Sequence, residues 1–521
     1  MRKKDGTIGV IIIKTYGRIT IFANYTEKQL LSGTEEEIRE KVLDIMQNSI
    51  ELHNKNRNET DYLYSYYYGN QDIYSTKEKH TRTEIDNRTV ENWCYAFIDF
   101  KKNYLLGKPI QYVRNDSSAS EEISELNKYV QYENKKSKDI DLYEDILVCG
   151  RGFRYTNTDK VTEEDEAPFE IINCKPELTE VVYSSKLGNE QLLSFIETDM
   201  KYITQEVNPE TGKKEDVTKY YSEYTVYLRN RQYVISNKTG SLAFEGNSQP
   251  ISLNEHVITE YYVNKRRISL IEIGKDLFDT LNNIESLDLD DMEAYVNNLL
   301  VFINCEATEE DLKGMAELGA VNITSTDNKR ASIETVQQRL QADGTQIHYN
   351  RILNALHQIL GIPRANSEGN IDHDTGKSML VGQGFTSSSI RIEGDETKFA
   401  DCDKQSVKVM LKICKSSPKS SIKELKIIDL NIKFQRDFSD NLLVKTQGLQ
   451  NLLTAKIPKK YALQIPNLFS DVEAVVKDME EEEKTNEKKQ QEMFSKTSSN
   501  ENPEEQNNNI VKTQELQNQE Q

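Results

Sequence analysis

The segment 268–304 constrains the fold of this chain most, because it carries the clearest helical pattern in the sequence. Ser269 and Glu272 form a capping box at its start, in which each side chain accepts the backbone N–H of the other residue. At ~1.5 Å per residue such a helix would be about 55 Å long. Its apolar residues recur at helical spacing, namely Ile273, Leu277, Leu281, Ile284, Met292, Val296, Leu299 and Phe302. A long helix whose opposite face carries Asp288, Asp290 and Asp291 is suited to pack against copies of itself.

A short mixed segment, a second helix and a polar loop follow this helix in order. Residues 305–332 contain short helical and strand-like patterns, and 333–361 carries a second helical pattern that stops at Gly361 and Pro363. The loop 363–376 is polar and contains glycine. A loop of that length between two helices is uncommon unless it is functional or disordered.

In the first half of the chain, the spacing of the apolar residues changes once, from a helical period to a period of two. Helical patterns at 30–50, 90–107 and 120–150 precede a region of period two, from Phe153 to about Val263. Turn sequences at 208–212 and 237–240 separate the expected strands. The chain is therefore predicted to be an α+β protein with an antiparallel sheet. From Ser495 onward the polar sequence lacks periodicity, and we expect disorder there.

The composition limits the possible functions. The chain has a net charge of -20, whereas tight binding of nucleic acid depends on Lys and Arg contacts to phosphates. No apolar run approaches ~20 residues, so we expect no membrane span. The six cysteines form no C-x-x-C pair, which favours reduced, buried thiols of a cytosolic protein over three disulfides.

No motif predicts an enzyme or a cofactor. Gly376-Lys377-Ser378 resembles the end of a phosphate-binding loop, but position 371 is Ile where that loop requires Gly. Asp372-His373-Asp374 lacks further ligands at helical spacing, so a solvated loop is favoured over a metal site. The three aspartates at 288–291 could imitate a nuclease site, but a solvated helix face is the simpler interpretation.

Several short motifs together resemble portal proteins of tailed bacteriophages, in the branch from siphophages and prophages of Gram-positive hosts. They are Tyr66-Tyr-Tyr-Gly69, Asn87-Arg-Thr-Val-Glu-Asn92 and Tyr104-Leu-Leu-Gly-Lys-Pro-Ile110, followed by Gly361-Ile-Pro363 with Asp374-Thr-Gly376, and by the stretch from Asn441 to Glu480. The resemblance covers residues 50–485. The first ~45 residues have no counterpart in it, and Ser378-Met379 stands where relatives carry small or apolar residues.

The resemblance implies a portal fold in a ring-shaped homo-oligomer of twelve copies. Its parts would be a wing of helices and antiparallel strands, an α-helical stem, a small α/β clip and a helical crown. The implied boundaries are an N-terminal extension at 1–49, the wing at 50–267, stem helices at 268–304 and 333–361, and the clip at 305–332. A tunnel loop at 363–376, a kinked helix returning to the wing at 377–439, the crown at 440–490 and a disordered tail at 491–521 would complete the chain.

The resemblance also implies roles for particular residues. The stem would line a DNA channel with Asp288, Asp290 and Asp291. The tunnel loop would face DNA through Arg364, Asn366, Ser367, Glu368, Asn370, Asp372, His373, Asp374 and Lys377. The clip would dock the packaging motor or connector through Glu306, Glu309, Glu310, Lys313, Asp327, Lys329 and Arg330.

The implied function is a conduit for packaging and ejecting DNA at one capsid vertex, without enzymatic activity, metal or cofactor. The expected partners are further copies of the chain, double-stranded DNA in transit, the terminase large subunit, capsid and scaffolding proteins, and a head-completion adaptor. The chain is expected in the virion and, during assembly, in the host cytoplasm. The alternatives are a head-assembly or scaffold-like protein without a channel and, from another class, a nuclease or ATPase acting on DNA.

Overall fold

The computed structural model describes residues 17–75, 85–115, 121–157, 166–207, 214–296, 299–303, 305–306, 324–325, 332–336, 342–364, 385–434, 442–464 and 475–485. The chain divides into two compact units, of which the larger comprises Met1–Gly107 and Val130–Ser420. The smaller unit comprises Lys108–Tyr129 and Ser421–Gln521. Both contain helices and strands, so the chain is an α+β protein, as the sequence predicts.

The main sheet of the larger unit has the strand order β1-β5-β6-β7-β8-β10, with β9 paired to β8. Its neighbours pair in antiparallel fashion except β1 and β5, which are parallel. The strands are β1 (Ile21–Ala23), β5 (Thr179–Ser184), β6 (Gln191–Val207), β7 (Lys214–Tyr227), β8 (Arg231–Ser236), β9 (Ala243–Phe244) and β10 (Gln249–Pro250). The hairpin predicted around 208–212 joins β6 to β7, because Val207 pairs with Lys214; the turn itself lies outside the described residues.

Helix α2 (Glu35–Tyr67) packs its apolar side against this sheet. Thr34 caps it with a capping box to Glu37, and the helix contains most of the helical pattern predicted at 30–50. Short helix α1 (Glu27–Leu30) precedes it. The core between α2 and the sheet contains Ile38, Val42, Ile45, Met46, Val182, Leu193, Phe195 and Val226. The expected boundary between an N-terminal extension and a wing, at 49/50, thus falls inside one continuous helix.

A buried histidine strengthens the contact between α2 and the sheet. His53 Nε2 lies 3.0 Å from Glu197 Oε2, and its Nδ1 lies 3.6 Å from Glu180 Oε2. Burial alone would lower the pKa of His53, but the two carboxylates raise it above its usual value. Burial opposes ionisation of the glutamates, yet Arg151 and His53 lower the pKa of Glu180 to about 2. His53, Ser222 and Arg57 likewise lower the pKa of Glu197 to about 2.

Further helices and a second sheet complete the larger unit's compact part. This sheet has the order β11-β3-β4, from β3 (Gly152–Asn157), β4 (Glu170–Cys174) and β11 (Ile258–Tyr261). The helices are α3 (Trp93–Leu106), α5 (Lys135–Cys149) and α10 (Phe385–Ser416), with a 3-10 turn η1 at Asp72–Ser75. α3 and α5 end at Gly107 and Gly150, as the sequence indicated, and Gly150 adopts the left-handed conformation with φ +86°.

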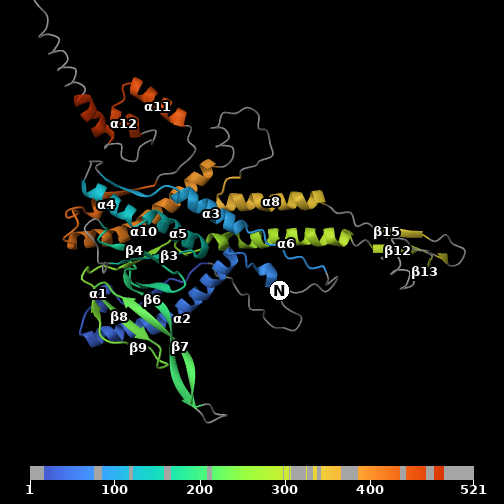
Figure 1. Cartoon of the computed structure of the whole chain (residues 1–521), viewed down its shortest axis with the longest axis horizontal. Helices are drawn as coiled ribbons and strands as arrows, with labels where there is room; N and C mark the ends of the chain where they lie inside the picture. Colours follow the sequence, from blue (N-terminus) through green and yellow to red (C-terminus); the bar gives the residue numbers. More distant parts are fainter. Residues whose placement is uncertain are drawn as a thin grey trace, which may run out of the picture. The chain divides into compact units, whose positions relative to one another are not determined.

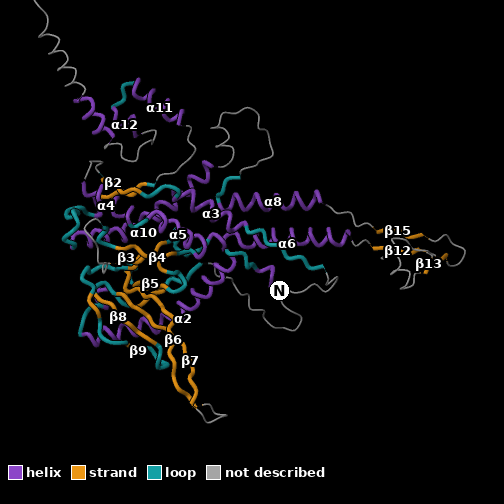
Figure 2. The backbone as a smooth tube through the Cα atoms, in the orientation of Figure 1, coloured by secondary structure: helices purple, strands orange, loops and turns teal. Residues whose placement is uncertain are grey.

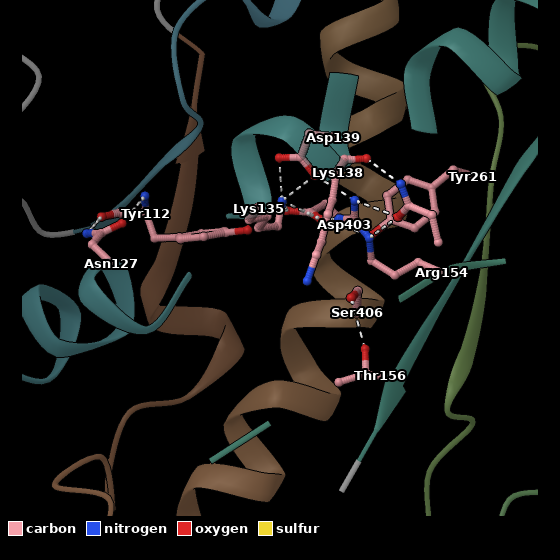
Figure 3. A network of polar contacts seen from close by, with 11 residues as sticks. Tyr112, Asn127, Lys135, Lys138, Asp139, Arg154, Thr156, Tyr261, Asp403 and Ser406 are labelled. Atoms are coloured by element: carbon pink, nitrogen blue, oxygen red, sulfur yellow. Dashed lines mark hydrogen bonds and ion pairs between the residues drawn. The ribbon is translucent and has the colours of Figure 1, made fainter. Parts of the chain in front are cut away.

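A buried network of charges joins α5, β3, β11 and α10 (Figure 3). Lys135 Nζ lies 2.8 Å from Asp139 and 3.2 Å from Asp403. Arg154 contacts the same two aspartates at 2.7 and 3.5 Å. Tyr261 donates its hydroxyl to Asp403 at 2.9 Å. Two cations and two anions balance here in a region without solvent access, so the network stabilises only while it is complete.

Helices α6 (Leu270–Val296) and α8 (Ala342–Leu360) lie side by side in the larger unit (Figure 1). α6 stops eight residues short of the predicted end at 304, because β12 (Leu299–Ile303) pairs with β15 (Ser332–Val336). The second helix likewise starts at Ala342, not at 333. Short apolar runs such as Leu299–Ile303 suit a helix or a strand equally, and pairing with a distant segment decides between them.

The remaining strands are short (Figure 2). β13 (Cys305–Glu306) pairs with β14 (Thr324–Ser325) between α6 and α8 in the sequence. In the smaller unit β2 (Gln111–Arg114) pairs with β16 (Leu430–Lys433), which follows a 3-10 turn η2 (Ile427–Asp429). α4 (Glu121–Tyr132), most of which belongs to this unit, holds β2 through Asn127, whose side chain bonds both backbone groups of Tyr112. α11 (Leu442–Thr454) and α12 (Lys459–Gln464) follow.

The predictions about disulfides and membrane spans can be compared with the described residues. Cys94, Cys149, Cys174, Cys402 and Cys414 are free thiols, which excludes the arrangement with three disulfides. None of the helices among the described residues has the length and apolar content that a membrane crossing requires.

Candidate functional site: the polar stripe and the open face of α6

Helix α6 begins as the sequence predicts. Ser269 N–H donates to Glu272 Oε2 at 2.8 Å, and Glu272 N–H donates to Ser269 Oγ at 3.0 Å. This reciprocal pair is the capping box. Glu272 also accepts hydrogen bonds from Gly17 N–H and Arg18, so the start of the helix is fixed to the N-terminal part of the described chain.

One face of α6 carries a stripe of polar residues that point at another part of the chain. We call Lys275, Asp279, Asn282, Ser286 and Asp290 the polar stripe. They recur every three or four residues, so at roughly 100° per residue they share one side of the helix. Four of the five are at most 6% exposed, and Asn282 is fully buried. Buried polar groups require partners, and residues 62–92 supply them.

The first turns of the stripe bind the tyrosine-rich end of α2. Lys275 Nζ lies 2.8 Å from Asp279 and 2.5 Å from Asp72. Tyr66 donates its hydroxyl to Asp279 at 2.8 Å, and Tyr62 donates to Asp72 at 2.7 Å. Burial would lower the pKa of Lys275, but the two aspartates raise it, so this lysine is charged at neutral pH.

An amide pair forms the middle of the stripe. Asn282 Oδ1 accepts the backbone N–H of Glu91 at 2.9 Å, while its Nδ2 donates to Gln71 Oε1 at 2.5 Å. Gln71 in turn donates to Asn92 Oδ1 at 3.1 Å, and Asn92 donates to the carbonyl of Tyr67. These contacts tie the chain on both sides of η1 to α6.

The last turns of the stripe hold an extended segment, residues 85–92, which we call the strap. Thr89 N–H donates to Ser286 Oγ at 2.9 Å. Asn87 donates to Asp290 Oδ1 through its backbone N–H at 2.7 Å and its side chain at 3.0 Å. Residues 87, 89 and 91 of the strap thus bind residues 290, 286 and 282 of α6 in that order. The strap therefore runs antiparallel to the helix. Asp290 is therefore a structural acceptor with 6% exposure rather than part of an open acidic face.

Apolar residues occupy much of the rest of α6, but only some of them are covered. Phe278 and Leu281 are buried, and Gly274 lets α8 approach so closely that an added Cβ would lie 3.3 Å from Leu356 Cδ2. Ile273 and Leu287, in contrast, are 52% and 55% exposed. The open face, as we call it, comprises these two residues with Asp276, Asn283 and Asp291, all exposed. α8 adds Ile347 and Ile359, which are 71% and 48% exposed.

The sequence-predicted site residues are distributed unevenly over the described chain. Asp291 is exposed on α6 and Asp288 is half-buried, so the predicted acidic face keeps two of its three members. Arg364 donates from its guanidinium to Asn354 and, at 3.1 Å, to Asn350, and so lies back along α8. Glu306 belongs to β13. The other predicted loop and clip residues lie outside the described residues: Asn366, Ser367, Glu368, Asn370, Asp372, His373, Asp374, Lys377, Glu309, Glu310, Lys313, Asp327, Lys329 and Arg330.

Sequence reasoning missed the polar stripe, although its spacing was visible. Lys275, Asn282 and Ser286 lie at helical intervals opposite the apolar residues, but a polar helix face usually indicates solvent. The partners come from segments about 200 residues away in the chain, which no local pattern reveals. Among the described residues no group of three or more His, Cys, Asp and Glu side chains could hold a metal ion.

Comparison of the sequence with known proteins shows the family of this chain. A family model for phage portal proteins of the SPP1 Gp6-like type matches residues 47–489. The portal protein of Bacillus phage SPP1 is 22% identical over 284 residues, which are 53% of this chain and 53% of that protein. The chain thus aligns with about half the length of that relative. The family model covers most of the sequence, including the motifs 66–69 and 87–92, whose residues contact the polar stripe. The chain therefore belongs to the family of phage portal proteins.

Proposed function

We propose that this chain assembles into a closed ring of twelve copies at one vertex of a viral head, where the ring encloses a channel through which double-stranded DNA is packaged and ejected. Family membership and the open face of the α6–α8 pair support this proposal. The SPP1 relative carries the name portal protein, which denotes this kind of entrance.

The open face is the observation that carries the assembly. Ile273, Leu287 and Ile347 are each more than half exposed on two long helices, although each could be buried by another helix. Large exposed apolar side chains on two helices that lie side by side are candidates for contact with another protein chain. Copies that contact one another through two different faces form a closed ring when the rotations from each copy to the next add up to one full turn. A second copy of the chain is therefore the partner that we assign to this face.

In the assembled ring, α6 and α8 would form the stem and their connecting segment, 297–341, the clip. Asp288 would keep DNA from sticking, because like charges repel and the phosphates find no counter-charge there. Asp290 is omitted from this role since it binds Asn87, and Asp291 is omitted since it belongs to the open face. Arg364 in the tunnel loop, 363–376, and Lys377 directly after it would supply transient phosphate contacts. Substituting Asp288 by Lys should slow packaging and leave ring assembly intact; an unchanged packaging rate would exclude this role.

The partners follow from the same proposal. The clip would dock the terminase large subunit, which supplies the energy of ATP hydrolysis, and later the head-completion adaptor. The compact part of the larger unit would form the wing and contact capsid and scaffolding proteins, and residues 440–490 would form the crown. The protein would therefore reside in the virion and, during assembly, in the host cytoplasm.

Self-association through the open face can be tested with charged substitutions. Leu287→Asp combined with Ile347→Asp should abolish the assembly in native mass spectrometry without lowering thermal stability, because both side chains are solvated in the free chain. Leu187→Asp is the matched control, since Leu187 is fully exposed on a turn of the main sheet. Wild-type assembly in the double variant would exclude the open face as the contact.

A further inference from the structure

The apolar residues of α6 leave its rotation about its own axis poorly defined. From Leu287 through Ile273, Leu281 and Phe278 to Ile271 they span about 200° of the helix circumference at ~100° per residue. Only the part around Ile271, Phe278 and Leu281 is buried. Ile273 and Leu287 lie about 140° and 180° around the helix from Phe278 at ~100° per residue, so a rotation of that size would turn them toward the core in its place. Burial of apolar area is not directional, so apolar contacts by themselves constrain the rotation of α6 less sharply than hydrogen bonds do.

The polar stripe is narrow and directional. Its five residues span about 80° at ~100° per residue, and each of them has an assigned partner in the chain. Asn282 is the most constrained member, because it is fully buried and both ends of its amide are bonded to different segments. Any other rotation would leave the N–H of Glu91 and the amide of Gln71 without these partners. A buried polar residue can in this way select one arrangement among several of similar apolar burial.

We propose that Asn282, supported by Ser286, is a positioning residue for assembly: it sets the rotation of α6 and thereby decides which residues α6 presents to the next copy. The inference rests on the proposed ring. The angle between neighbouring copies follows from the direction of the open face, so an error in the rotation of α6 changes how many copies close the ring. Asn282 itself contacts no other copy, since it is buried within its own chain.

Native mass spectrometry of the full-length chain tests this inference, because it counts the copies in each assembly. Wild-type protein should give one copy number. Asn282→Leu should spread the assemblies over two or more copy numbers, or lower the closed fraction several-fold. Val226→Ala is the control: Val226 is fully buried in the main sheet, so its truncation lowers stability without touching the stripe. It should keep the wild-type copy number even if its thermal midpoint falls as far as that of Asn282→Leu.

The outcomes separate the inference from the proposed function. A single wild-type copy number in Asn282→Leu would overturn the positioning role and leave the ring in place. The same spread in Val226→Ala would also overturn it, because general instability would then be the cause. If Asn282→Leu does not fold, Ser286→Ala decides, since it removes the acceptor for Thr89 N–H and the hydroxyl that donates to the carbonyls of Asn282 and Thr89, and leaves Asn282 in place. Absence of closed assemblies in the wild type would overturn the proposed function itself.

Discussion

Asp403→Asn should destabilise the larger unit strongly, because it unbalances a fully buried set of charges. Lys135 and Arg154 face Asp139 and Asp403, and all four side chains are at most 4% exposed. The substitution leaves two cations against one anion, and its amide offers one acceptor oxygen where the carboxylate offered two to Tyr261, Arg154 and Lys135. Removal of one partner from a buried ion pair costs about 3–5 kcal/mol. We expect a loss in this range in the free energy of unfolding, measured by urea denaturation.

Asp401 provides the matched control on the same helix. Its side chain is 55% exposed and lies 3.6 Å from Lys404, also largely exposed. Because surface pairs contribute about 0–1 kcal/mol, Asp401→Asn should change stability by no more than that. Asp403→Leu with Lys135→Met keeps the remaining charges balanced and should cost less than Asp403→Asn. If Asp403→Asn lies within about 1 kcal/mol of wild type, the argument from buried charge balance is refuted.

Three further perturbations test separate parts of the fold. Ser269→Ala should lower stability in urea by about 1 kcal/mol, because it removes the hydroxyl that caps α6; no change would exclude a role for the capping box. Gly150→Ala should impair folding more than Gly240→Ala, although both residues have positive φ, because an added Cβ at 150 would lie 1.9 Å from the carbonyl oxygen of Arg267 and nothing lies within 4 Å at 240. Because the pKa values of Glu180 and Glu197 are lowered in the folded state, their ionised forms stabilise the fold above pH ~4.3. This stabilisation is lost as the pH falls toward the folded pKa values of about 2. The stabilisation from the raised pKa of His53 is fully present below pH ~6.5 and is lost as the pH rises through its folded value. His53→Gln should therefore remove the alkaline decline and weaken the acid one, because His53 also lowers the pKa of Glu180 and Glu197; an alkaline decline that persists would assign it elsewhere.

The elements that the sequence predicted correctly are those with local signals. Ser269 starts α6 through a capping box, and Gly107 and Gly150 end α3 and α5. These signals act over three or four residues, so a sequence contains all the information they need. The family resemblance is confirmed as well, since a family model for phage portal proteins matches residues 47–489.

The errors concern contacts between distant segments. Leu299–Ile303 continues the apolar pattern of α6 but forms a strand, because Ser332–Val336 offers a pairing partner. Asp290 has the composition of a solvated face but binds the strap. Neither partner can be found by periodicity, since each lies far away in the chain. The polar stripe was missed because a helix face that binds an extended segment and one that faces water have the same residue types.

Electron microscopy of the purified wild-type chain, with class averages along the symmetry axis, tests the central claim most directly. The account predicts closed rings of one copy number with an open channel on the axis and α6 and α8 running beside it. Compact particles without a channel, or open filaments in which the copies never close, would contradict it.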